Sequence, residues 1–328
     1  MAGDLLVARK DGNTWRLVRV TLGSGGEAAL AVLPFHPQEA AASPNGSSVL
    51  YVSGGRGLAV VDAESGAVRR ISLSALPIRA IDGATWVSNH EIVFGGSRKD
   101  YASPETSSLY IADTTTGNVS AFRGLKGGEP SYADDAESLT FVTRRELKRA
   151  PYPYRDSFGP WVKETLWLLR SLNARKPKVL TSDVLYIDAG RAFNGSLISP
   201  DGRYVLNAIT GTDVSVTYQL IEVHFLGHVF LQLSGGSPHA MAWRGSKVAF
   251  VQSQLPSYPA KLGLFVYDTS TGALVQYSSS VFGQLDWSPN GDLVGAAWRP
   301  GGEVFVSAAS NLGAWVSVGA GEVPVWVK

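Results

Sequence analysis

Apolar and polar residues alternate between Leu264 and Val294 in a way that predicts several short β-strands in succession. An apolar run from Leu264 to Tyr267 stops at Asp268, and a Thr-Ser-Thr-Gly segment follows. That segment is typical of a tight hairpin turn, because short polar side chains bond the backbone and Gly adopts positive φ. Ala273 to Tyr277 and Leu285 to Trp287 predict two further strands. The unit therefore consists of consecutive strands joined by tight turns.

The same unit recurs along the chain. A strand followed by an Asp-x-x-x-Gly turn occurs at Val60–Gly66, Ile111–Gly117 and Val266–Gly272, and a Ser-Pro-Asx-Gly turn begins at Ser43, Ser199 and Ser288. The position two residues before that Pro, or its equivalent, is occupied in turn by Ala42, Trp86, Ala133, Ile198, Trp243, Trp287 and Trp326. A period of roughly 40 to 45 residues with four strands per unit is the signature of a β-propeller blade.

The strand pattern predicts an all-β fold, a seven-bladed β-propeller with four antiparallel strands per blade, formed by residues 1–328 as a single domain. Six complete blades are expected at about Glu39–Leu76, Ile81–Lys126, Glu129–Ser182, Arg191–Ser234, Pro238–Ser279 and Phe282–Ala320. The N-terminal segment supplies only three strands, at Leu5–Ala8, Trp15–Arg19 and Ala29–Val32. We expect Val323–Val327 to pair with them, because this pairing closes the ring and hides exposed strand edges.

Composition narrows the classes of function. With 29 Lys plus Arg and 28 Asp plus Glu the net charge is +1, so nothing draws the chain as a whole to nucleic acid or to a membrane surface. The chain has no Cys, which excludes disulfides, thiolate metal ligands and Cys nucleophiles. No signal peptide and no apolar stretch of 18 residues is found, so we expect a cytoplasmic protein without a membrane partner, and we expect it to be a monomer.

Long insertions are expected on one face of the ring. The connections between the second and third strands are long in four consecutive blades, at Ser97–Ser107, Arg144–Lys163, Thr210–Ser215 and Ser253–Leu262. In an up-and-down blade these connections lie on the same face as the links between blades. Insertions gathered on one face of a repeat array often mark its binding face. We call it the loop-rich face and expect a protein or peptide partner there.

The mouth of the central channel on the loop-rich face is the first candidate site. Four residues before each aligned position lie Gln38, Asp82, Glu129, Asn194, His239, Gly283 and Glu322. Closed into a ring, the three carboxylates and the imidazole could bind a cation, an amine or a peptide N-terminus. The alternative is that these residues are polar only because water reaches the links between blades. The metal, if there is one, is not indicated by the sequence, and no cofactor is expected.

The predicted blade-three loop, Arg144–Lys163, is the second candidate site. Basic residues interleave there with aromatic ones, and those expected to bind are Arg149, Tyr152, Tyr154, Arg155 and Trp161. Arg, Tyr and Trp are the residue types that dominate the energetics of protein interfaces. The alternative is a loop folded onto its own blade, with buried aromatics and solvated charges. Binding of single-stranded nucleic acid is the version that the near-neutral charge disfavours.

The sequence resembles two groups of propellers. Its Ser-Pro-Asx-Gly and Asp-x-x-x-Gly repeat is similar to that of TolB and of the N-terminal propeller of the prolyl-oligopeptidase family, and the blades are WD-repeat-like in length. Within blade three, FVTRR, DSFGPW and TLWLL look like the corresponding blade of acylaminoacyl-peptidases. In those peptidases the propeller caps a separate hydrolase domain that holds the catalytic residues. That domain is not expected here, since the chain ends where the ring closes, and no catalytic residue is carried over.

Two hypotheses of function follow. The first is a non-catalytic binding or scaffolding propeller that contacts protein partners through the loop-rich face, with a cap or regulator of a separate hydrolase as one version. The alternative is an enzyme, or a small-ligand or metal-binding propeller, that uses the polar channel mouth. No Ser lies in a Gly-x-Ser-x-Gly frame, the motif of a hydrolase nucleophile, which favours the first hypothesis.

Overall fold

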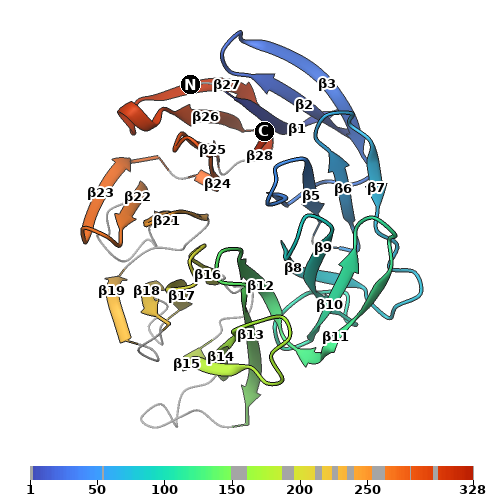
Figure 1. Ribbon diagram of the computed structural model, residues 1–328, viewed down its shortest axis with the longest axis vertical. Helices are drawn as coiled ribbons and strands as arrows, with labels where there is room; N and C mark the ends of the chain where they lie inside the picture. The colour runs from blue at the N-terminus through green and yellow to red at the C-terminus, as the bar shows by residue number, and fades with distance from the viewer. Residues whose placement is uncertain are drawn as a thin grey trace.

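The computed structural model describes the chain except for residues 1–2, 54, 149–160, 187–195, 211–215, 224–227, 235–239, 253–262, 281, 298–301 and 328. The described residues form seven four-stranded antiparallel sheets, which are arranged around a common centre like the blades of a propeller (Figure 1). The only helix among them is a short 3₁₀ turn, Ala309–Asn311. The predicted fold class is therefore confirmed.

Each blade follows the chain in order from its innermost to its outermost strand. Blade one contains β4 (Glu39–Ala42), β5 (Ser48–Val52), β6 (Leu58–Asp62) and β7 (Val68–Arg70). Blade two contains β8 (Ala80–Trp86), β9 (Glu91–Ser97), β10 (Ser107–Asp113) and β11 (Val119–Lys126). Blade three contains β12 (Gly128–Ala133), β13 (Ser138–Leu147), β14 (Trp161–Leu169) and β15 (Lys178–Tyr186).

The remaining blades keep this order. Blade four contains β16 (Ser196–Ile198), β17 (Tyr204–Thr210), β18 (Val216–Glu222) and β19 (His228–Ser234). Blade five contains β20 (Met241–Arg244), β21 (Lys247–Gln252), β22 (Gly263–Asp268) and β23 (Ala273–Ser278). Blade six contains β24 (Phe282–Trp287), β25 (Leu293–Ala297), β26 (Glu303–Ser307) and β27 (Trp315–Ala320).

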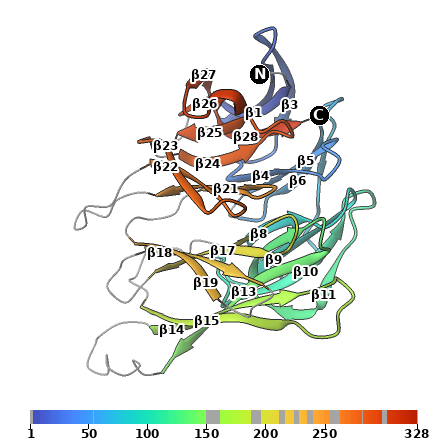
Figure 2. The same ribbon diagram turned by 60° about the vertical axis from the view of Figure 1, so that its left-hand side comes forward.

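Both ends of the chain build the seventh blade. Its strand order is β28 (Glu322–Val327), β1 (Asp4–Asp11), β2 (Thr14–Thr21) and β3 (Gly26–Leu33). β28 is antiparallel to β1, with Trp326 opposite Leu5 and Val325 opposite Leu6. Figure 2 shows this sheet between blade six and blade one. The predicted closure of the ring by the C-terminal strand is confirmed.

Two repeated turns use the chemistry that the sequence indicated. In the Ser-Pro-Asx-Gly turns, the hydroxyl of Ser199 donates to Asp201 at 2.6 Å and accepts from the backbone N–H of Tyr204 at 3.0 Å. Ser43 bonds in the same way. In the Asp-x-x-x-Gly turns, Asp113 accepts the N–H groups of Thr115 and Thr116 at 2.7 and 3.0 Å. These bonds to the ionised form lower the pKa of the Asp113 carboxyl.

The hydrophobic core is divided among the interfaces between neighbouring blades. Successive residues of a strand point to opposite faces. In β5, Leu50 therefore packs against blade two, whereas Val49 and Tyr51 pack against blade seven. Because each sheet buries both of its faces in this way, the inner strands are apolar at almost every position, and a blade depends on both neighbours for its stability.

Indole N–H groups connect the innermost strands of neighbouring blades. Trp86 donates to the carbonyl of Ala41 at 2.9 Å, Trp243 to that of Leu197 at 3.0 Å and Trp287 to that of Ala242 at 3.1 Å. Each acceptor lies one residue before the aligned position in the preceding blade. This repeated bond explains why the sequence places Trp at that position in several blades.

The closing blade departs from this pattern. Trp326 is almost fully buried, yet no described residue accepts a hydrogen bond from its indole N–H. The carboxylate of Asp286 instead accepts the backbone N–H of Trp326 at 3.0 Å and that of Trp287 at 2.9 Å. Asp286 thus joins blade six to the closing strand, and burial raises the pKa of its carboxyl to about 7 against the opposing effect of the two N–H groups.

This difference predicts unequal effects of two matched substitutions. Trp287→Phe removes an indole and a hydrogen bond between blades, whereas Trp326→Phe removes an indole of similar burial whose N–H has no described acceptor. We expect Trp287→Phe to lower the free energy of unfolding by about 1 kcal/mol more than Trp326→Phe, the net contribution of one hydrogen bond. Urea unfolding of both variants measures this difference, and equal losses would show that the indole bonds do not hold the blades together.

Candidate functional site: the channel mouth

The innermost strands begin with bulges where the channel opens on the loop-rich face. The register of β8 against β9 shifts between Asp82 and Ala84, and that of β12 against β13 shifts between Gly128 and Ser131. Gly83 has φ 70° and Glu129 has φ 50° in these bulges. A non-Gly residue with positive φ stores strain, and strained residues and bulges both gather at functional sites. The backbone thus marks this mouth as a candidate site.

Asp82 is buried between blades two and three. Its side chain packs so closely on Gly128 that a Cβ atom there would lie 1.7 Å from Oδ2, so only Gly fits at this position. The residue is 8% exposed, and Oδ2 has no hydrogen-bond partner among the described residues. Burial raises the pKa of Asp82 to about 6, although the Ser107 hydroxyl and the Arg144 guanidinium act in the opposite direction.

Glu129 lies among several charges. Its Oε2 atom is buried without a hydrogen-bond partner in the described part of the chain. The pKa of Glu129 is raised well above its usual range, first by burial and then by the negative charges of Asp82 and Glu164, while Arg144 opposes the rise. Arg144 and Glu164 form an ion pair at 3.3 Å across β13 and β14, and each side chain is 8% exposed. The Arg144 guanidinium is therefore the positive charge that acts on three carboxylates, those of Asp82, Glu129 and Glu164.

Glu39, at the start of β4, belongs to the same group. Its side chain is exposed to solvent where the channel opens, although the protein around it reduces its hydration. This desolvation, and then the charge of Asp82, raises the pKa of Glu39 to about 7. We call Glu39, Asp82, Glu129 and Glu164 the mouth carboxylates. Arg144 is the cation whose charge acts on Asp82 and Glu129.

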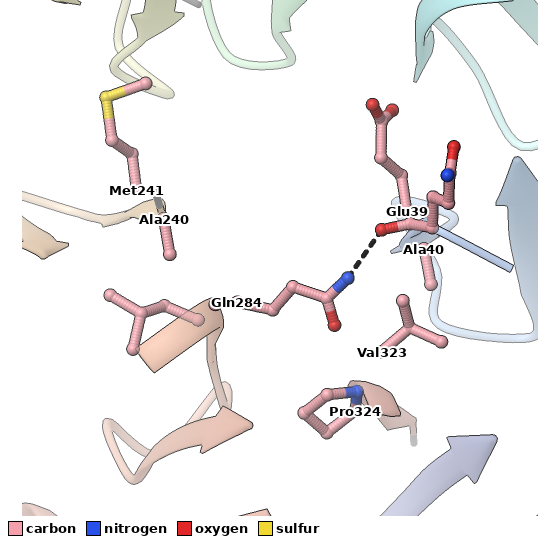
Figure 3. A pocket seen from close by; sticks show the side chains of 10 residues that line it. Glu39, Ala40, Ala240, Met241, Gln284, Val323 and Pro324 are labelled. Carbon is pink, nitrogen blue, oxygen red and sulfur yellow. Dashed lines mark hydrogen bonds between the residues drawn. The ribbon is translucent and has the colours of Figure 1, made fainter. Parts of the chain in front are cut away.

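A cavity of about 350 Å³ opens beside Glu39. Its lining residues come from the innermost strands of blades one, five, six and seven and from the links before them: Gln38, Glu39, Ala40, Ala240, Met241, Gly283, Gln284, Leu285, Val323 and Pro324. Figure 3 shows the Gln284 side chain reaching across to the Gln38 carbonyl, to which its amide N–H donates, while the Glu39 carboxylate stands apart from this bond. The cavity is therefore apolar on one side and acidic on the other.

The sequence predicted some members of this site and missed others. Asp82 and Glu129 come together, and Gln38 and Gly283 line the cavity. Glu322 accepts a hydrogen bond from His36 at 2.9 Å, and the His36 ring stacks on Trp15 with centroids 4.3 Å apart. His36, which is not among the predicted site residues, is thus a partner of one of them. His239 and Asn194 lie outside the described residues.

Glu39, Arg144, Glu164 and Gln284 are the members that sequence reasoning missed. Glu39 and Gln284 each lie one residue after a position of the predicted set, so a one-residue change in register would have found them. Arg144 and Glu164 were harder to find. Their pairing depends on β13 and β14 running past the expected strand ends, where Arg144 stands opposite Glu164 and Leu147 opposite Trp161.

The predicted blade-three loop is consequently shorter than the sequence suggested. β13 continues to Leu147 and β14 begins at Trp161, so the predicted loop bounds, Arg144–Lys163, are wrong at both ends and Arg144 lies within a strand. Arg144 fits inside a blade because Glu164 neutralises its charge. Trp161 is 3% exposed and is covered by the protein itself. Arg149, Tyr152, Tyr154 and Arg155 lie outside the described residues.

Two searches of the described residues bear on the class of site. No three His, Cys, Asp or Glu side chains in the described part of the chain come together in a way that could hold a metal ion. Nor does any helix in that part have the length and apolarity needed to span a membrane.

The raised pKa values predict that the protein becomes less stable as the pH rises from about 4 to about 7. The folded state keeps protons on Asp82 and Glu39 that the unfolded chain releases near pH 4, so each unit of pH in this interval favours unfolding. Asp82→Asn removes one of these groups. We expect its loss of stability between pH 5 and pH 8 to be about 1.4 kcal/mol smaller than that of the unmodified chain, because the pKa of Asp82, about 6, lies one unit above the start of this interval and one unit equals about 1.4 kcal/mol.

Urea unfolding at several pH values tests this expectation. Asp100→Asn is the matched control, because its side chain is 84% exposed on the same face. It should leave the pH dependence unchanged. A variant Asp82→Asn that loses stability with pH as steeply as the control would contradict the burial of a protonated Asp82.

Comparisons with known proteins support the fold. No family model matches the sequence, and a search of curated proteins finds no match. The structure is similar to TolB from Acinetobacter baumannii (TM-score 0.55, 15% identity, covering 98% of this chain and 81% of that one). It is also similar to an oligogalacturonate lyase in complex with manganese (TM-score 0.55, 15% identity, 86% and 79%).

A third similar structure is the β-propeller domain of Cps50 (Swd1) from Myceliophteria thermophila (TM-score 0.52, 13% identity, 89% and 93%). At these identities the likeness concerns the fold, and it agrees with the resemblance seen in the repeats. The chain is a seven-bladed β-propeller whose fold is similar to those of TolB and of the Cps50 (Swd1) propeller domain.

Proposed function

We propose that this chain is a non-catalytic interaction propeller, which holds a protein partner on the loop-rich face and receives a basic group of that partner at the channel mouth. The observation that carries the proposal is the arrangement of the mouth carboxylates. Desolvation raises the pKa values of Glu39, Asp82 and Glu129, repulsion by neighbouring carboxylates adds to the rise at Glu39 and Glu129, and Arg144 opposes the shifts at Asp82 and Glu129. A Lys or Arg side chain, or an N-terminal amine, would supply the missing positive charge.

Two further observations support a ligand at this place. The Asp82 carboxylate is more than nine-tenths buried and leaves Oδ2 without a described hydrogen-bond partner, a condition that costs free energy unless something else satisfies it. The cavity of about 350 Å³ beside Glu39 has room for an inserted side chain. Glu129 also has a positive φ, as do Gly83 and Val323 near the start of other innermost strands.

The propeller fold is consistent with a protein-interaction role, and similar folds occur in TolB and in the Cps50 (Swd1) propeller domain. One of these structures is a chain of the mitotic checkpoint complex, an assembly of several proteins (TM-score 0.51, 14% identity). We extend the proposal to Arg149, Tyr152, Tyr154 and Arg155 as contacts at the rim, on their residue types, and leave out Trp161 because it is buried. A cap or regulator of a separate hydrolase is a narrower version that rests on the sequence resemblance.

Affinity capture from an extract of the source organism tests the proposal with two matched variants. Glu39→Gln removes a mouth carboxylate, whereas Glu64→Gln makes the same change in the exposed Asp62–Gly66 turn on the opposite face. We expect the unmodified chain and Glu64→Gln to retain the same partner, and Glu39→Gln to bind it about tenfold more weakly, as for the loss of one charge-assisted bond. Equal retention by both variants would contradict a role for the mouth.

The same partner should bind more tightly as the pH rises from 5.5 to 7.5. In this interval Asp82 and Glu39, with pKa values of about 6 and 7, lose the protons that compete with a cation. Dissociation constants measured at both ends of the interval check the direction. A second variant, in which a Gly/Ser linker of equal length replaces residues 149–160, tests the rim separately from the mouth. If this variant binds the partner more weakly but with the same pH dependence, the replaced residues contribute to the contact.

The unmodified chain and the Glu39→Gln variant also test the alternative that the channel mouth binds a small ligand. The channel cavity favours this alternative over an enzyme with a metal, because its lining offers an apolar side and one carboxylate. If the unmodified chain captures no protein, titration with a small amine such as lysine amide shows whether the mouth takes a free cation. Binding of that amine, abolished by Glu39→Gln, would replace the protein partner with a small molecule.

A further inference from the structure

A second cavity, of about 440 Å³, lies in blade one and is lined by Arg56, Arg70, Ile71, Ser72, Leu73 and Ser74. Arg56 belongs to the connection between β5 and β6, and the other residues run from the end of β7 into the link to β8. Both connections are on the loop-rich face. The cavity shares no residue with the channel mouth or with the cavity beside Glu39.

The lining of this cavity is basic and contains no carboxylate. It presents two guanidinium groups and two hydroxyl groups above a floor formed by Ile71 and Leu73, which are 1% and 4% exposed. Neither Arg56 nor Arg70 has an acidic side chain within ion-pair distance among the described residues. Five other described arginines do have one, in the pairs Arg9 with Glu27, Arg16 with Asp11, Arg19 with Asp4, Arg79 with Asp100 and Arg144 with Glu164.

Backbone contacts hold the cavity open. Arg56 donates from Nη2 to the carbonyl of Leu73 at 3.0 Å, which fixes one edge of its guanidinium and leaves its other N–H groups for a ligand. Ile71 donates its backbone N–H to Leu58 at 2.9 Å, so the segment that follows Arg70 is tied to β6. The Ser72 and Ser74 hydroxyls lie 3.0 Å apart on the rim. Two like charges in one place repel each other, and an anion between them removes that repulsion.

We propose that the Arg56–Arg70 cavity binds a small molecule through an oxyanion, a phosphate or a carboxylate group. A guanidinium offers paired N–H donors whose spacing matches two oxygens of either group, and the hydroxyls of Ser72 and Ser74 add hydrogen bonds to the remaining oxygens. The cavity is within the size range of small-molecule sites, so it has room for more than the bare anion. The near-neutral net charge of the chain shows that this basic cavity is a local feature.

Calorimetric titration tests the proposal with inorganic phosphate and, separately, with citrate, each at constant ionic strength set by chloride. We expect saturable binding of at least one of the two, and the one that binds identifies the group. The Arg70 side chain is exposed and has no ion-pair partner among the described residues. The substitution Arg70→Gln should therefore weaken that binding by about tenfold or more. Arg56→Lys keeps the charge but loses the paired donors, and it should weaken the binding in the same way.

Arg98→Gln is the matched control, since it removes an exposed Arg from the corresponding connection of blade two. It should bind phosphate and citrate like the unmodified chain. The proposal fails if neither anion gives more heat than chloride, or if Arg70→Gln and Arg98→Gln bind equally well. The channel mouth is formed by other residues. A negative anion titration would therefore not contradict the proposed function, and a negative affinity capture would not contradict anion binding at the Arg56–Arg70 cavity.

Discussion

The pairing of β28 with β1 is the constraint on which the rest of the structure depends. Every blade buries both faces against its neighbours, so a ring that failed to close would leave two apolar faces in water at once. The C-terminal strand prevents this by joining the first and last parts of the chain in one sheet. Asp286 reinforces the joint from blade six through the backbone N–H of Trp326. Local stability therefore comes from long-range contact, as in other closed repeats.

Closure also creates the conditions for the channel mouth. Seven innermost strands that converge on one axis bring their first residues close together, whatever those residues are. In blades two and three the convergence buries carboxylates, and the bulges at Gly83 and Glu129 turn the backbone at that point. The result is a group of acids that is partly protonated near neutral pH and is balanced in part by Arg144. A ring that serves only as a scaffold has no need of such a group.

The two candidate surfaces have opposite charge and lie on the same face. Most of the mouth carboxylates are buried or partly buried and they interact with one another, whereas Arg56 and Arg70 are exposed and the Arg56 guanidinium is held by the Leu73 carbonyl. A partner that lies across this face would therefore meet an acidic centre and a basic site in blade one. This combination can set orientation as well as affinity, since complementary charges favour one way of docking over others.

The sequence by itself determined the repeat, the number of blades, the closure and the two repeated turns. Each of these follows from local chemistry: a Ser or Asp that bonds the backbone, a Gly at positive φ, and strands of alternating character. It also placed Asp82 and Glu129 at the mouth, because equivalent positions in a ring must meet. It could not find the Arg144–Glu164 pair, since charged residues favour a loop unless the partner across the strand is known.

Only the tertiary structure decided which side chains share an environment. His36 meets Glu322 across 286 residues, and Gln284 meets Gln38 across 246 residues. The cavity at Arg56 and Arg70 forms between two connections that are unremarkable in sequence. The pKa values of Glu39, Asp82 and Asp286 likewise depend on how much protein surrounds each carboxyl, because burial is a property of the closed ring and is absent from any single strand.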